Sequence, residues 1–341
     1  MSSVKLENRF KVSVVVPVYN TAEYLPECFD SLVGQSIGLD SIQIVVVDDG
    51  STDGSAEVIK AYADRYPGNF VCLSQENSGQ GAARNLGLVL CEGEYVGFMD
   101  SDDFADADMY RSLYEAVKNA DADMCVCGIA CFSDHGKGRE YVPSGQVPPS
   151  LVTQQSLFVA PRTGPTIRIV RRAVLVENDI RFPETRGCED NGFHFKLAPF
   201  CKNVVSVPAP MAYQRLRSGS TSVSVSPYFC EQFFSVMDDA LEYYKEHGLL
   251  GEYGELLEAA LVRMLLCSQL GCVGLVKDPS DRAALMDKTM AYINGPFSGR
   301  KNNRYLTGLL GMYLRYAGRR TIGFTQVYFA HAYRKRLNMG A

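Results

Sequence analysis

The chain has 341 residues, of which 46% are hydrophobic and 21% are charged. This balance is typical of a globular protein and excludes a mostly disordered chain. The length fits one large domain or two ordinary ones. We expect neither a membrane-spanning helix nor secretion, because no run of about 18 uninterrupted apolar residues occurs and the start of the chain lacks the pattern of a secretory signal. Eleven cysteines, an odd number, indicate reduced thiols in a cytosolic protein.

The net charge of −5 is unevenly distributed along the chain. Between Pro296 and Ala341 there are nine lysines and arginines and no aspartate or glutamate, so this stretch carries +9 and the rest of the chain −14. A basic stretch on an acidic protein favours a polyanionic partner. An anionic membrane surface fits better than a nucleic acid, because no nucleic-acid recognition motif accompanies the charge.

Strand and helix patterns alternate through the first hundred residues. Strands are predicted at 12–16, 42–47, 70–73 and 95–99. Helices are predicted at 22–33, 55–66 and 81–90. Because the strands are continuously apolar and are separated by helices, we expect a mostly parallel sheet with helices on both faces.

The patterns become more varied after residue 106 and purely helical after Ser226. The predicted elements are a helix at 107–119, a strand at 124–129, a polar loop at 133–149, a helix at 191–198 and strands at 204–207 and 210–214. Further helices are predicted at 231–247, 254–272 and 279–292. We place a domain boundary near Ser226, between an α/β domain at 1–226 and a helical region at 227–341.

Three of the predicted strands end in polar segments. These segments are 17–20 (PVYN), 48–51 (DDGS) and 100–103 (DSDD). The carboxyl ends of parallel strands meet at one edge of the sheet, where ligands bind, so the segments should converge on one crevice. Carboxylates gathered there repel each other unless a cation intervenes, and Asp100 and Asp102 are oxygen ligands suited to Mg²⁺ or Mn²⁺. Such an ion completes its shell with substrate phosphates, which predicts a nucleoside diphosphate ligand. The alternative is that these aspartates cap helices or lie in turns.

Five segments resemble a known family when taken in order. They are VSVVVPVYN, IVVVDDGSTDGS, NSGQGAARNLGL, GEYVGFMDSDD and CEDNGFHFKL. In sequence and spacing they resemble the inverting nucleotide-sugar glycosyltransferases of family 2, which have the GT-A fold. The resemblance covers about 12–226, two thirds of the chain. It implies a Rossmann-like sheet with a nucleotide-sugar-binding half at about 1–105 and an acceptor half at about 106–226. The helical region at 227–341 would be a C-terminal α-helical extension of this fold.

The resemblance also implies roles for individual residues of the donor site. Pro17 and Tyr19 would line the base pocket, and Asp49 would accept a hydrogen bond from the base. Arg84 would lie near the nucleotide. Asp100 would contact the ribose side and share with Asp102 the Asp-x-Asp (DXD) metal site.

The pair Glu189 and Asp190 matches the segment that carries the general base of the family. Inverting transfer needs a base that removes the proton of the acceptor hydroxyl as its oxygen attacks the anomeric carbon. The resemblance assigns this role to Asp190, and the neighbouring carboxylate of Glu189 would raise its pKa. The alternative is that both residues only open the helix predicted at 191–198, where carboxylates are favourable. The two interpretations are compatible.

The segment 213–222 resembles a family segment that closes over the pyrophosphate. Arg215 and Arg217 offer guanidinium groups that bind phosphate oxygens in pairs. Together with the metal, they would stabilise charge on the departing nucleoside diphosphate. The alternative is a solvated basic loop.

One stretch departs from the family pattern. Residues 165–172 (PTIRIVRR) lie where many relatives carry a Trp-x-Lys-Leu-Tyr-like pattern, and the chain contains no tryptophan. That region usually faces the acceptor, so the acceptor is not inferred from relatives. His194 lies one helical turn after Asp190 and could face the site, but a surface or packing role is favoured for it.

The sequence therefore predicts a metal-dependent inverting glycosyltransferase, hexosyl- or N-acetylhexosaminyl-transferring. The donor would be a UDP-sugar and the acceptor a hydroxyl of a glycan or lipid-linked glycan in surface polysaccharide synthesis. We expect a cytoplasmic protein. The basic C-terminal helices would either attach it to the inner membrane face or pack on the catalytic domain with a solvated basic edge. A nucleotidyltransferase would need a Gly-rich, Lys-bearing loop after the first strand, which 17–20 does not provide. An inactive sugar-nucleotide-binding or membrane scaffold would have lost the Asp-x-Asp motif or the base, and both are intact.

Overall fold

A computed structural model describes residues 8–135, 138–143, 153–216 and 226–338. The chain divides into two compact units. The α/β unit contains Met1–Gln154 and Thr163–Leu216, and the helical unit contains Gln155–Arg162 and Arg217–Ala341. Residues 155–162 thus belong to the helical unit, although they precede the boundary expected near Ser226.

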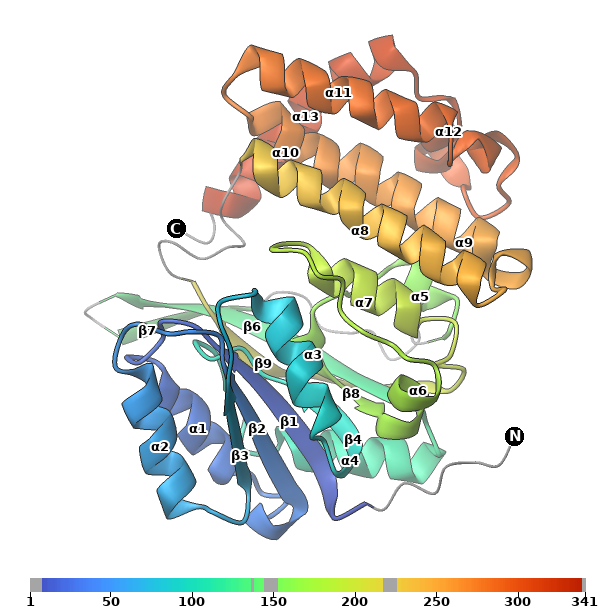
Figure 1. The fold of residues 1–341 in the computed structure, drawn as a ribbon. Helices are drawn as coiled ribbons and strands as arrows, with labels where there is room; N and C mark the ends of the chain where they lie inside the picture. Colours follow the sequence, from blue (N-terminus) through green and yellow to red (C-terminus); the bar gives the residue numbers. More distant parts are fainter. Residues whose placement is uncertain (1–7, 136–137, 144–152, 217–225, 339–341) are drawn as a thin grey trace. The chain divides into compact units, whose positions relative to one another are not determined.

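A mixed sheet forms the centre of the α/β unit (Figure 1). Its strands are β1 (Phe10–Val18), β2 (Ile42–Asp48), β3 (Phe70–Ser74), β4 (Gly93–Phe98), β5 (Phe104–Ala105), β6 (Met124–His135), β7 (Gly138–Pro143), β8 (Arg168–Arg171) and β9 (Val204–Arg215). The strand order is β3-β2-β1-β4-β8-β6-β9-β5, with β7 paired to β6. Strands β1 to β4 are parallel to one another, as predicted, and β8 and β7 run antiparallel to their neighbours.

Helices cover both faces of this sheet. They are α1 (Leu25–Val33), α2 (Ser55–Arg65), α3 (Gln80–Val89), α4 (Met109–Ala120), α6 (Arg172–Glu177) and α7 (Glu189–Leu197). On β1, Val14 and Val16 pack in one cluster with Phe29 of α1. Val15 faces the other way, where a Cβ placed on Gly87 of α3 would lie 2.5 Å from its Cγ1. Because both faces are buried, β1 needs a continuous apolar sequence rather than an alternating one.

Two expectations about the second half of the sheet were wrong. Part of the predicted loop at 133–149 is a hairpin, because β6 continues to His135 and pairs with β7, with Ser133 opposite Glu140. Strand β7 pairs with β6 alone, and such an edge strand needs backbone pairing but no apolar face, so its polar sequence resembles a loop. Residues 136–137 and 144–152 lie outside the described residues. The two strands predicted at 204–207 and 210–214 are one strand, β9, with an irregularity opposite Cys127 and Gly128.

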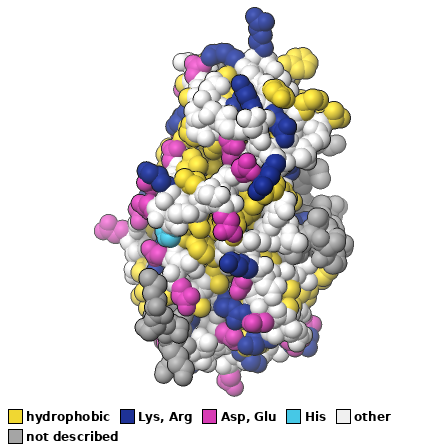
Figure 2. Space-filling view, turned by 90° about the vertical axis from the view of Figure 1, so that its right-hand side faces the viewer, with side chains coloured by type: hydrophobic (Ala, Val, Ile, Leu, Met, Phe, Trp, Pro, Cys, Tyr) yellow, Lys and Arg dark blue, Asp and Glu magenta, His cyan; other side chains and the backbone are white. Residues whose placement is uncertain are grey.

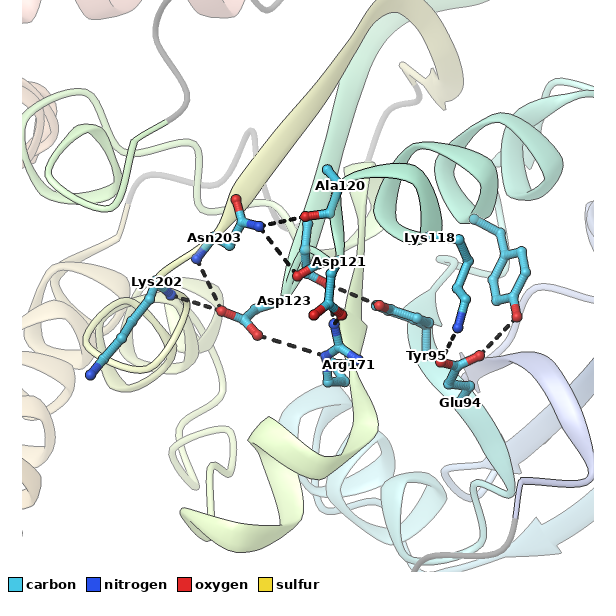
Figure 3. Close-up of polar contacts among 11 residues, drawn as sticks. Glu94, Tyr95, Lys118, Ala120, Asp121, Asp123, Arg171, Lys202 and Asn203 are labelled. Carbon is cyan, nitrogen blue, oxygen red and sulfur yellow. Dashed lines mark hydrogen bonds and ion pairs between the residues drawn. The ribbon is translucent and has the colours of Figure 1, made fainter.

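Polar contacts fix the amino ends of β4, β6 and β9 (Figure 3). Asp123 accepts hydrogen bonds from the backbone N–H of Asn203 at 3.0 Å and lies 3.7 Å from Nε of Arg171. Arg171 also donates to Asp121 at 2.7 Å, and the Tyr95 hydroxyl donates to the carbonyl of Ala122 at 2.8 Å. These contacts hold the end of the sheet that lies away from the carboxyl ends of β1, β2 and β4.

The helical unit is built from helices alone in its described residues. They are α5 (Ser156–Val159), α8 (Pro227–Glu246), α9 (Leu250–Arg263), a π-helical stretch (Met264–Gln269), α10 (Leu270–Leu275), α11 (Pro279–Asn294), α12 (Gly308–Tyr316) and α13 (Arg319–Asn338). Capping residues explain two of the starts. Ser226 accepts a hydrogen bond from the N–H of Phe229 before α8, and Asp278 accepts from two N–H groups of α11.

One stretch of the described residues, Leu250–Leu275, has the length and apolar composition of a membrane-spanning helix. Its most apolar window is 72% buried within the protein. All eleven cysteines lie in described residues, and none of them forms a disulfide.

Candidate active site

The carboxyl ends of β1, β2 and β4 are tied together by polar contacts. After β1, the Asn20 side chain accepts a hydrogen bond from the N–H of Thr52 at 2.8 Å, and the Thr21 hydroxyl donates to Ser101 at 2.9 Å. The N–H of Asp49 donates to the carbonyl of Val18 at 2.8 Å. The three polar segments identified in the sequence therefore form one continuous rim at this edge of the sheet.

Pro17 and Tyr19, the residues expected to line a base pocket, have different surroundings. Pro17 is buried within β1, opposite Val47 of β2. Tyr19 is 48% exposed, just beyond the end of the strand. Its ring is accessible for stacking, whereas Pro17 mainly fixes the backbone from which Tyr19 projects.

The buried carboxylate of Asp49 holds the loop that precedes α3. Its Oδ1 accepts hydrogen bonds from Nε2 of Gln75 at 2.7 Å and from the N–H of Ser78 at 2.8 Å, and its Oδ2 accepts from the N–H of Gly79 at 2.8 Å. Gly79 has a φ of 93°, which suits glycine. Because a carboxylate accepts about four hydrogen bonds, Oδ2 retains capacity for one further donor.

Arg84 of α3 lies at the centre of the site and is only 1% exposed. Its Nη2 donates to Oδ1 of Asp100 at 2.7 Å, and its Nη1 contacts Glu189 at 2.9 Å and Asp190 at 3.0 Å. Burial by itself lowers the pKa of Arg84, but the three carboxylates outweigh it and raise that pKa. One buried guanidinium thus joins the end of β4, where the metal site is predicted, to the start of α7, where the base is predicted.

An apolar cluster supports Arg84 from behind. Phe182 stacks on Phe193 of α7 with ring centroids 4.0 Å apart, and Phe98 of β4 meets both rings edge to face. The Arg84 guanidinium lies 5.2 Å from the centre of the Phe182 ring. Its Nε is buried and has no hydrogen-bond partner among the described residues. This packing keeps α3, β4 and α7 together around the charged groups.

The two carboxylates at the start of α7 differ in exposure. The Glu189 side chain is 2% exposed and the Asp190 side chain is 32% exposed, so of the two Asp190 is the one that an acceptor can reach. Burial raises the pKa of Asp190 well above its ordinary range. The positive charges of Arg84 and Arg168 lower this pKa, and the negative charges of Glu189 and Asp100 raise it further. A carboxylate with a raised pKa is better matched to proton abstraction.

Three aspartates crowd the end of β4. Burial raises the pKa of Asp103 well above its ordinary range, and the charges of Asp100 and Asp102 raise it further. Asp103 does not cap the following helix, since α4 is preceded by Asp108. Instead, its carboxylate accepts a hydrogen bond from the N–H of Arg215 at 2.8 Å.

The fit of a divalent cation rests on Asp100 and Asp102. Both are partly exposed oxygen ligands at a place where carboxylates already repel one another. Within the described residues no group of three His, Cys, Asp or Glu side chains could hold an ion. The donor set therefore fits an ion that takes its remaining ligands from substrate phosphates and water.

Arg215 is bound by the protein itself. Its guanidinium donates to Glu27 at 2.5 Å and to the carbonyl oxygen of Asp102 at 3.0 Å, and it lies between the rings of Tyr24 and Phe132. The geometry therefore does not support the expectation that Arg215 covers a pyrophosphate, and it instead fixes the backbone at Asp102. Arg217 lies outside the described residues.

Arg168 of β8 is a site residue that was not singled out from the sequence. It is fully buried, and its Nη1 lies 2.9 Å from Nδ1 of His194, one turn after Asp190 on α7. Burial lowers the pKa of Arg168 to about 10, opposed by Cys201, Asp190 and Cys127. His194 is buried, so of the surface and packing roles favoured for it only packing fits. The available signal was a single arginine inside the apolar run 166–170.

Comparison with known proteins agrees with this arrangement. Residues 13–177 match the family model described as glycosyl transferase family 2. The chain is 29% identical over 258 residues to the putative glycosyltransferase EpsH of Bacillus subtilis (strain 168), covering 74% of each protein. It is 30% identical over 242 residues to a poly(ribitol-phosphate) beta-glucosyltransferase of Bacillus spizizenii, covering 70% of this chain but 37% of that protein.

The fold agrees with solved structures as well. The crystal structure of residues 1–349 of S. aureus TarS in complex with UDP-GlcNAc superposes with a TM-score of 0.68 and 23% identity, over 96% of this chain and 92% of that one. The mixed sheet with helices on both faces, followed by C-terminal helices, has GT-A-like structural neighbours. Residues 13–177 of the chain therefore form a glycosyltransferase family 2 domain, and the fold is GT-A.

Proposed function

We propose that the protein is an inverting glycosyltransferase that moves a sugar from a UDP-sugar to a hydroxyl group of a surface glycan or a lipid-linked glycan. The observation that carries this proposal is the buried Arg84, which joins Asp100 on the donor side to Asp190 on the acceptor side. Such a connection holds the proposed metal site and the proposed base at a fixed separation, as group transfer requires. It also gives an inactive scaffold little support, since a scaffold needs no such coupling.

A nucleoside diphosphate donor is supported by the rim of the sheet. The Tyr19 ring can stack on the base, and Oδ2 of Asp49 can accept one hydrogen bond from the base N–H. UDP is the first candidate, because the similar TarS structure contains UDP-GlcNAc. The transferred sugar would be a hexose or an N-acetylhexosamine.

We assign the metal to Asp102 with Asp100, and Mg²⁺ or Mn²⁺ is the ion suited to these ligands. When bound, it supplies stabilisation of the charge on the leaving diphosphate. Arg84 holds one oxygen of Asp100, so Asp102 would be the principal ligand. Arg215 contributes indirectly through its hydrogen bond to the carbonyl of Asp102.

Asp190 would be the general base. In its ionised form it removes the proton of the acceptor hydroxyl, whose oxygen then attacks the anomeric carbon from the face opposite the diphosphate. An α-linked donor would then give a β-linked product, which agrees with the beta-glucosyltransferase name of one relative. Glu189 stays buried behind Asp190 and keeps the second contact of Arg84 Nη1.

The acceptor is a hydroxyl of a polymer or lipid-linked glycan of surface polysaccharide. Support comes from the poly(ribitol-phosphate) enzyme among the relatives. Because this chain spans about a third of the length of that enzyme, the acceptor of the relative is a starting point for a screen.

Calorimetric titration of UDP tests the donor half of the proposal. We expect binding in the presence of Mn²⁺, and loss of the metal-dependent part in Asp102→Ala. The matched control is Asp64→Ala, which removes an exposed carboxylate on α2 that pairs only with Lys60 in the contacts of the structure. Binding of GDP, CDP and dTDP should be weaker. If none of the four nucleotides binds with metal, the donor assignment is wrong.

A further inference from the structure

The last two helices of the helical unit expose an unusual number of large apolar side chains. Phe324 is 85% exposed and Leu309 is 83% exposed. Six of the exposed side chains are named here the C-terminal apolar face: Leu309, Met312, Tyr316, Phe324, Val327 and Tyr328. Single exposed apolar residues are ordinary, but a contiguous group marks an interaction surface. Figure 2 shows hydrophobic side chains beside Lys and Arg side chains at the upper end of the molecule, over the helical unit.

One side of α13 packs within the helical unit, and the opposite side is exposed. On its other side α13 lies close against α10, where a Cβ placed on Gly274 would lie 2.7 Å from Cβ of Ala330, and one on Gly271 would lie 2.9 Å from the carbonyl oxygen of Phe329. The exposed residues Phe324, Val327 and Tyr328 follow the spacing of a single helix face. Helix α13 is therefore held in place by α10, and its exposed apolar face is available to bind a partner.

Helices α12 and α13 contact each other. The Tyr313 hydroxyl of α12 lies 2.9 Å from the Thr325 hydroxyl of α13, which links the helices directly. Leu306 and Leu314 are buried, so part of the apolar stripe that the sequence shows on α12 is used for packing. The exposed part and the face of α13 form one surface of the helical unit.

Basic side chains flank this surface. Arg320 and Arg334 are exposed on α13. Other cations of the basic stretch have partners in the protein, because Arg304 pairs with Glu255 and Arg319 pairs with Asp287. The stretch from Pro296 to Ala341 contains no acidic residue. An occupant of the surface must therefore combine an apolar interior with negative charge at its boundary.

We propose that the C-terminal apolar face binds the surface of an anionic lipid bilayer. Aromatic and aliphatic side chains would enter the headgroup boundary, and Arg320 and Arg334 would contact lipid phosphates. A second copy of the chain is a poorer occupant, because it would bring the same arginines against each other. This inference goes beyond the proposed transfer reaction and does not depend on it.

Vesicle co-sedimentation tests this proposal on the full chain. We expect the protein to sediment with vesicles of mixed phosphatidylglycerol and phosphatidylcholine, and much less with phosphatidylcholine alone. Arg320→Gln with Arg334→Gln should weaken partitioning by about 30-fold, since each basic residue near an anionic surface contributes about 1 kcal/mol, which is roughly fivefold. Phe324→Ser with Tyr328→Ser should weaken it by about tenfold or more.

Matched variants on the α/β unit are the controls. Val89→Ser removes an exposed apolar side chain of α3, and Arg65→Gln removes an exposed arginine of α2. Neither should change partitioning. UDP binding measured without vesicles should be the same in all of these variants, which separates a failure of this proposal from a failure of the proposed function.

Three results would overturn the proposal. The first is absence of sedimentation with anionic vesicles, and the second is equal sedimentation of the wild type and both double variants. The third is a dimer in analytical ultracentrifugation that Phe324→Ser with Tyr328→Ser abolishes, because the face would then join two copies of the chain. Circular dichroism of each variant confirms that the helices are retained.

Discussion

Two arginines at opposite ends of the same sheet illustrate how burial changes the role of one side chain. Arg171 contacts Asp121 and Asp123 at the amino ends of the strands, where the side chain of Asp121 is 93% exposed (Figure 3). Arg84 contacts three carboxylates at the carboxyl ends and is almost completely buried. Water reaches Arg171 and Asp121, whereas Arg84 and Glu189 are almost completely shielded from water. Similar ion pairs thus join strands near the surface at the amino ends of the sheet, and hold the carboxylates of the candidate active site in place at its carboxyl ends.

The largest loss of activity is expected from a substitution of Asp190, the proposed base that Arg84 contacts. Asp190→Asn removes the proposed base while preserving the size of the side chain. Sugar transfer should fall by about 100- to 10,000-fold, which is the contribution of general base catalysis. UDP affinity in calorimetry should be unchanged. Retention of wild-type transfer by this variant would remove Asp190 from the mechanism.

Loss of the two arginines should distinguish the two ends of the sheet. Arg84→Ala should lower the free energy of unfolding by about 3 kcal/mol, the lower end of the range for breaking a buried ion pair, because Asp100 and Asp190 are partly exposed. Arg171→Ala should lower it by less than about 1 kcal/mol. Urea denaturation measures both. Equal losses would mean that burial does not separate the two ends.

Substitution of Arg215 tests whether this buried arginine stabilises the fold or binds the phosphates of the ligand. Arg215→Ala should lower the free energy of unfolding by about 2 kcal/mol, since it removes the bonds to Glu27 and to the carbonyl of Asp102. UDP binding measured without metal should not change. A weaker metal-free affinity in a folded variant would restore the phosphate-binding role that the sequence suggested.

The raised pKa of Asp190 predicts opposite pH dependences for activity and stability. Activity needs the ionised form, so kcat/KM should fall about tenfold per pH unit below the raised pKa. The folded protein holds a proton on Asp190 more tightly than the unfolded chain does. The resulting stabilisation is present at low pH and is lost as the pH rises through the raised pKa. Both dependences should be missing in Asp190→Asn, and an acid limb at the ordinary pKa of an aspartate would contradict the burial argument.

The first half of the sheet could be predicted because its physical demands are visible in the sequence. A strand buried on both faces, such as β1, must be continuously apolar, and a polar segment after it marks the ligand edge. The family resemblance then indicated where Arg84 and Asp190 would lie. Their direct contact was not predictable, because 105 residues of sequence separate Arg84 from Glu189 and no local pattern records such a pairing.

The errors have different physical causes. The edge strand β7 was predicted to be a loop because backbone hydrogen bonds hold it to β6, and these do not require a particular pattern of side chains. The pyrophosphate role of Arg215, which came from the family resemblance, stays a prediction, and the contacts of its guanidinium with Glu27 and two aromatic rings could not be foreseen from that resemblance. Arg168 went unnoticed because a buried arginine inside a strand is uncommon and its partner, His194, lies on another element.

The separation between Arg84 and its partners also has a consequence for synthesis of the chain. A ribosome releases α3 and β4 well before it releases α7, because translation proceeds from the N-terminus at about 5–20 residues per second. During that interval Arg84 has Asp100 as a partner, but Glu189 and Asp190 have not yet emerged. The nascent sheet must therefore keep this guanidinium hydrated until α7 arrives. The candidate active site is completed only when the second half of the α/β unit docks on the first.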